Sequence, residues 1–183
     1  MSKANTNFGS QVKAEGSTAT ASRSVRGCAD EVKAALCEAW LPRIYRARIL
    51  PLRTRAFHLT LPTRRARIET QHTLLGVELK INHYRIMCPD LATARYLGVW
   101  ARAGCADVAV PYDITKVSHL ADELESAWHR MLLLIEHDAR SASASLRSRV
   151  RRRLIAEIQR EIKEAGAGRA IPEFNQNTKQ RRA

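Results

Sequence analysis

Hydrophobic residues recur every three or four positions in four parts of the chain, which is the spacing of one face of an α-helix. This spacing predicts helices over 30–41, 91–103, 116–135 and 146–165. We expect Asp30, Asp90 and Thr115 to cap the first three helices, because short polar side chains accept hydrogen bonds from the unpaired backbone amides there. Gly104 and Gly166 follow the second and fourth helices and are typical C-terminal stops.

Other segments alternate hydrophobic and polar residues, as half-buried strands do. The alternation predicts strands over 55–61, 66–70, 74–81 and 84–88, and a short buried strand over 107–110. Asn82-His83 is expected to form a two-residue turn between two of them. The segment 42–54 interleaves arginines with Ile, Tyr and Leu, and we expect it to be extended.

The predicted order is α-β-β-β-α-β-α-α, which indicates an α+β or α/β fold with a small mixed sheet of four or five strands and a C-terminal helix pair. The strands over 84–88 and 107–110 flank a helix, so they would form a right-handed parallel crossover if they share a sheet. The apolar stripe over 117–135 is wide, which predicts burial against another helix or a second subunit.

The composition of the 183 residues indicates one domain with polar ends. Residues 1–25 and the basic end over 167–183 are expected to be disordered. Between them we expect an α/β core domain over 26–139 and a basic amphipathic helix over 140–166. The four cysteines show no CxxC spacing and are expected to be reduced, buried thiols. No apolar run approaches the roughly 20 residues of a membrane span.

The net charge of +13 is unevenly distributed. Residues 42–70 carry eight arginines against one glutamate, and residues 140–183 carry twelve basic residues against four acidic ones. Guanidinium groups fit phosphate oxygens in two-point contacts, so these regions favour a nucleic-acid partner. The candidate binding residues form two clusters, which are Arg147, Arg149, Arg151, Arg152 and Arg153, and then Arg64, Arg65 and Arg67.

Glu78 and Lys80 place an acid and a base one residue apart on a predicted strand. With Glu69 before them and the predicted order of elements, this pattern resembles the core of the PD-(D/E)xK nucleases. The resemblance implies that Glu69 and Glu78 hold a divalent metal such as Mg²⁺, and that Lys80 stabilises the anionic transition state. The alternation with hydrophobic neighbours instead favours Glu78 and Lys80 as the solvent-exposed face of a strand.

The leading hypothesis is a non-enzymatic nucleic-acid-binding or ribonucleoprotein-associated protein that contacts the phosphate backbone of DNA or RNA without a cofactor. The first alternative is the metal-dependent nuclease, which would use Mg²⁺. The second is an assembly or adaptor protein that docks a protein partner, or a second copy of the chain, through the helix over 117–135. No Cys or His spacing points to a metal site. We expect an intracellular protein, cytoplasmic or nucleoid-associated, and an organellar transit peptide over the first 26 residues is the alternative.

Overall fold

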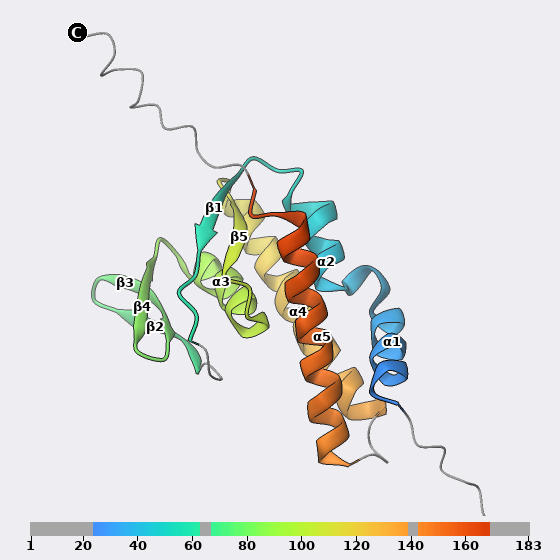
Figure 1. Cartoon of the computed structure of the whole chain (residues 1–183). Coiled ribbons are helices and arrows are strands. Elements are labelled where there is room, and N and C mark those ends of the chain that lie inside the picture. The colour runs from blue at the N-terminus through green and yellow to red at the C-terminus, as the bar shows by residue number, and fades with distance from the viewer. Residues whose placement is uncertain (1–23, 63–66, 139–142, 169–183) are drawn as a thin grey trace, which may run out of the picture.

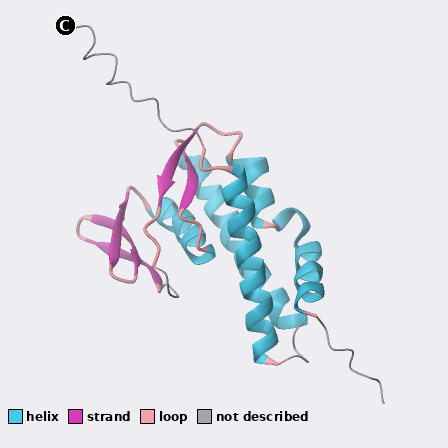
Figure 2. Ribbon diagram, viewed as in Figure 1, coloured by secondary structure: helices cyan, strands magenta, loops and turns pink. Residues whose placement is uncertain are grey.

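The computed structural model describes residues 24–62, 67–138 and 143–168. The helices are α1 (Val25–Leu36), α2 (Leu41–Ile44), α3 (Leu91–Ala103), α4 (Ile114–Asp138) and α5 (Ala144–Ala165), with a 3-10 turn η1 (Cys37–Ala39) and a π-helical turn η2 (Tyr45–Ile49). The strands are β1 (Thr54–His58), β2 (Ile68–Thr73), β3 (Gly76–Ile81), β4 (Tyr84–Cys88) and β5 (Asp107–Pro111). The fold is therefore α+β, as predicted, and it includes the predicted C-terminal helix pair (Figure 2).

The described strands form two antiparallel sheets rather than one mixed sheet. β2, β3 and β4 make a three-stranded meander, and β1 pairs with β5 so that Thr54 lies opposite Pro111. The prediction of a single small mixed sheet is therefore wrong. Because β4 and β5 lie in different sheets, α3 between them does not form a parallel crossover. α3 instead packs against the three-stranded sheet and against α4 (Figure 1).

Two tyrosine hydroxyl groups complete the second edge of β5. The Tyr45 hydroxyl accepts from the Ala109 amide at 2.8 Å and donates to the Gly166 carbonyl at 2.7 Å, and the Tyr96 hydroxyl donates to the Ala109 carbonyl at 2.6 Å. Buried backbone groups need such partners, and β1 satisfies only one edge of β5. Burial raises the pKa of Tyr45 to about 12, so this hydroxyl keeps its proton at neutral pH. These bonds connect β5 with η2, α3 and the end of α5.

α4 is the central helix of the molecule (Figure 1). It packs against α3 and also against α1 and α5. Val117, Leu124, Trp128 and Met131 are all buried in these contacts. The wide stripe predicted over 117–135 is therefore covered within the chain, and Leu133 is the large hydrophobic residue of that stripe that stays 69% exposed.

Two of the three predicted helix caps are wrong. α1 begins directly after Ser24, whose hydroxyl accepts a backbone amide at 3.0 Å, so Asp30 lies inside the helix. Asp113 takes the role predicted for Thr115, because its carboxylate accepts from the Thr115 amide at 2.9 Å. Asp90 caps α3 as predicted, with a backbone amide bond of 2.8 Å.

The segment predicted to be extended over 42–54 is helical in its first half. Leu41, Ile44, Tyr45 and Ile49 are buried at spacings of three, one and four residues, which is a helical pattern, and the arginines between them are exposed. Pro42 stands in the first turn of α2, where a missing amide hydrogen breaks no helical hydrogen bond. Counting apolar positions across the proline would have revealed this pattern.

Cys28, Cys88 and Cys105 are buried free thiols, whereas Cys37 is exposed, contrary to prediction. The predicted tails over 1–25 and 167–183 fall almost wholly outside the described residues, so they stay predictions. Across the described ranges, the helices all lack the length and apolar character needed to cross a membrane.

Candidate nucleic-acid interface on α5

α5 has one apolar side that fixes how the helix sits on the molecule. Val150, Leu154, Ile158 and Ile162 recur every four residues and are all buried. They pack toward α1 and α4, and the Ser143 side chain caps the helix start. The remaining sides of α5 carry most of its charge, and Figure 1 shows the helix at the front of the molecule with α4 behind it.

The five clustered arginines of α5 divide by their partners. Arg147 lies 3.4 Å from a carboxylate oxygen of Glu136, and Arg153 lies 3.2 Å from Glu157 one turn further along the helix. In the described part of the chain, the other three have no carboxylate within ion-pair distance, and they are Arg149, Arg151 and Arg152. Arg149 and Arg152 are exposed, and Arg151 is half-buried.

The glutamates later in α5 neutralise other parts of the protein. Lys33 of α1 lies 2.6 Å from a carboxylate oxygen of Glu161, which also accepts from the Trp40 indole at 3.2 Å. Arg46 of η2 approaches Glu161 to 3.5 Å, and Lys33 approaches Glu157 to 3.5 Å. The acidic residues of α5 therefore fasten the helix to α1 and η2 and leave its outer arginines uncompensated.

The exposed cations continue along α5 beyond the predicted cluster. Arg149, Arg152, Arg160 and Lys163 are spaced by three, eight and three residues, which keeps them on one side of a helix, and all four are exposed. We call these four residues the outer stripe. At 1.5 Å per residue it extends over about 21 Å. Sequence reasoning missed Arg160 and Lys163 because it followed charge density along the chain, whereas helical periodicity would have included them.

The second arginine cluster is only partly described. Arg64 and Arg65 lie outside the described residues. Arg67 precedes β2, and its backbone amide donates to the Asn82 side chain at 2.7 Å. Its side chain is 83% exposed and lies 2.6 Å from Glu69. The structure therefore places Arg67 beside the turn between β3 and β4, away from the arginines of α5 in the sequence and on a different element.

The three residues of the nuclease resemblance lie on one face of the meander. Glu69 is directly opposite Lys80 in the pairing of β2 with β3, and Glu78 is two residues from Lys80 on β3. Glu69 faces Arg67 at 2.6 Å, and Glu78, which is only 8% exposed, faces Arg85 at 3.5 Å. Both carboxylates thus have an arginine as their partner. Among the described residues, no group of three or more His, Cys, Asp or Glu side chains could hold a metal ion.

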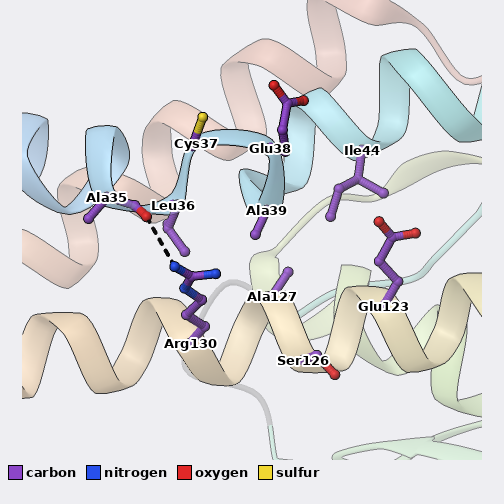
Figure 3. A pocket seen from close by; sticks show the side chains of 10 residues that line it. All are labelled: Ala35, Leu36, Cys37, Glu38, Ala39, Ile44, Glu123, Ser126, Ala127 and Arg130. Carbon is purple, nitrogen blue, oxygen red and sulfur yellow. Dashed lines mark hydrogen bonds between the residues drawn. The ribbon is translucent and has the colours of Figure 1, made fainter.

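A cavity of about 400 Å³ opens between η1 and α4 (Figure 3). Arg130 crosses it and donates to the carbonyl of Ala35 at 3.4 Å, while Cys37 and Glu38 point away from α4. Glu123 on its wall is paired with Arg48 at 3.1 Å. The charged groups here serve contacts within the protein and do not converge on one point.

Comparison with known proteins finds no protein-family model, no curated protein and no solved structure that matches the chain. The case for a function therefore rests on the residues and geometry described above.

Proposed function

We propose that the protein binds nucleic acid without catalysing a reaction, and that the outer stripe of α5, together with Arg151, contacts the phosphate backbone. The supporting observation is the sorting of charge on α5, because its glutamates face α1 and η2 while Arg149, Arg151 and Arg152 have no acidic partner in the described chain. Like charges gathered on one helix face repel each other, and a polyanion relieves that repulsion. Backbone contacts of this kind give affinity without reading a base sequence.

The test is a salt titration of binding, followed by fluorescence anisotropy with labelled duplex DNA and RNA. Each phosphate neutralised on duplex DNA contributes about −0.9 to the slope of log affinity against log salt. Four contacts from the outer stripe predict a slope near −3.6, which weakens binding roughly 150-fold between about 50 and 200 mM salt. Affinity that stays flat over that range contradicts the proposal.

Two variants of equal charge locate the surface. The first changes the outer stripe to glutamine at Arg149, Arg152, Arg160 and Lys163, and the second changes four exposed cations elsewhere, at Arg26, Arg43, Arg48 and Lys116. We expect the first variant to lose most of the salt-dependent affinity and the second to keep most of it. Equal losses in both would show that net charge, and not α5, governs binding.

The nuclease alternative keeps one supporting observation, which is that Glu69, Glu78 and Lys80 share a face of the meander. Incubation with plasmid DNA and Mg²⁺ distinguishes it from simple binding. Cleavage that disappears in Lys80→Ala while affinity stays unchanged would favour the enzyme. Its two carboxylates would first have to exchange their arginine partners for a metal ion, so we rank it second.

A further inference from the structure

One end of the meander carries two exposed rings in contact. His83 and Tyr84 follow the turn between β3 and β4, and their ring centroids lie 4.1 Å apart at an interplanar angle of 39°. His83 is exposed and Tyr84 is 39% exposed. Tyr45 and Tyr96, by contrast, are fully buried and serve β5. The His83–Tyr84 pair has no corresponding structural role in the core.

The turn that presents these rings is held firmly. Asn82 has a positive φ of 54°, a conformation that asparagine adopts more readily than most residues. Its side chain accepts from the Arg67 amide at 2.7 Å, and its own amide donates to the Arg67 carbonyl at 2.9 Å. A prearranged ring pair loses little conformational freedom on binding, so more of the interaction energy appears as affinity.

Cations surround the ring pair. Arg67 and Arg85 have side chains that are 83% and 63% exposed, and Lys80 lies opposite Arg85 in the pairing of β3 with β4. Two carboxylates face them, since Glu69 pairs with Arg67 and Glu78 with Arg85. Exposed ion pairs are worth only about 0–1 kcal/mol, so a phosphate can replace such a carboxylate at little cost.

We propose that this end of the meander, formed by Arg67, Lys80, His83, Tyr84 and Arg85, binds a single-stranded nucleic acid by stacking unpaired bases on the ring pair. Exposed rings beside cations are the arrangement with which proteins hold single strands, because every base has a stacking face and every linkage has a phosphate. Bases in a duplex are already stacked on each other and cannot use the rings. The inference rests on the proposed function in taking nucleic acid as the partner, and it adds a second surface and a strand preference.

The experiment compares four labelled probes of about 15 nucleotides or base pairs at one salt concentration. They are oligo-dT, oligo-rU, an abasic strand with the same phosphates, and a duplex. Stacking of one base predicts that the protein binds oligo-dT or oligo-rU roughly 5- to 150-fold more tightly than the abasic strand. The ratio of the dT and rU affinities reports which sugar the surface prefers.

The matched variants are His83→Ser with Tyr84→Val, which removes both rings while keeping a strand-forming residue at 84, and Tyr112→Val, which removes another exposed tyrosine. We expect the first variant to bind oligo-dT no better than the abasic strand and the second to keep the wild-type preference. Far-ultraviolet circular dichroism confirms folding, and the single change His83→Ser serves if the double variant is unfolded. Equal wild-type affinity for base-bearing and abasic strands overturns the inference, as does a preference that survives loss of the rings.

Failure of the proposed function has a different signature. Glutamines on the outer stripe of α5 should weaken all four probes alike and leave the preference for bases unchanged. If the protein binds no duplex but keeps a preference for oligo-dT that depends on the two rings, the α5 proposal fails and the inference about the meander stands.

Discussion

Replacing Glu161 with glutamine should separate α5 from α1 and η2 more than its conservative chemistry suggests. The carboxylate is only 13% exposed, lies 2.6 Å from the Lys33 ammonium and accepts from the Trp40 indole at 3.2 Å. Glutamine keeps one acceptor oxygen but removes the charge, which leaves Lys33 and Arg46 without their nearest carboxylate. Removing one member of a fully buried pair costs about 3–5 kcal/mol, and exposed pairs contribute about 0–1 kcal/mol.

The cost in this protein should fall between those limits. Lys33 and Arg46 have side chains that are 34% and 47% exposed, so water compensates part of the loss, and Lys33 can also turn toward Glu157. We therefore expect Glu161→Gln to lower the free energy of unfolding by about 2 kcal/mol. For a chain of this size that corresponds to a fall in Tm of roughly 4–8 °C.

Urea unfolding of the variant, measured by circular dichroism, provides the number, and Glu164→Gln is the control on the same helix. Glu164 is 58% exposed and its nearest arginine nitrogens are 3.9 Å away, so its loss should change stability by less than about 0.5 kcal/mol. A cycle with Lys33→Met isolates the pairwise part of the effect. The reasoning is refuted if Glu161→Gln is as stable as the wild type, or if both glutamines cost the same.

Three further predictions follow from the contacts described above. Tyr45→Phe leaves a buried amide of β5 unpaired, so urea unfolding should show a loss of about 1–3 kcal/mol. The wild type should also lose stability as pH rises from about 10 through about 12, because the raised pKa of Tyr45 favours the folded state only while the hydroxyl is protonated, and the variant should lose less. Asp90→Ala removes the cap of α3 and should cost about 1 kcal/mol, whereas Asp30→Ala should lie within about 0.5 kcal/mol of the wild type in the same assay. Leu74 and Leu75 are 106% and 84% exposed in the turn between β2 and β3, so serine at both should leave the urea midpoint unchanged and lower aggregation in light scattering.

Helical periodicity with terminal signals was the most reliable part of the sequence. Asp90 and Gly104 bound α3 as predicted, and Gly166 ends α5. The strand over 84–88 and its preceding turn are also confirmed, because alternation there is uninterrupted and Asn82 accepts a positive φ. These signals are local, since each depends on a few neighbouring residues, and they need no knowledge of what packs against them.

Pairing between distant strands was beyond the sequence. β5 joins β1 across about fifty residues, and its other edge is satisfied by side-chain hydroxyls from Tyr45 and Tyr96. Alternation shows that a strand has a buried face but not which strand is its neighbour. The same limit applied to the interface, since the sequence located the arginines of α5 but not the partners that neutralise Arg147 and Arg153.

The position of charge on α5 argues against a merely solvated surface. Arg149 lies three residues before Arg152, and Arg160 three before Lys163, so each pair repels by about 0.2–0.5 kcal/mol on a helix. A solvated face would lose nothing by exchanging one member of each pair for glutamine, and the folded state would become slightly more stable. Because the glutamates that would offset this repulsion are bonded to α1 and η2, the cost is built into the packing of the helix. If the outer stripe binds phosphates, the same glutamines must lower affinity as they raise stability, and a gain in stability without loss of affinity would favour the solvated face.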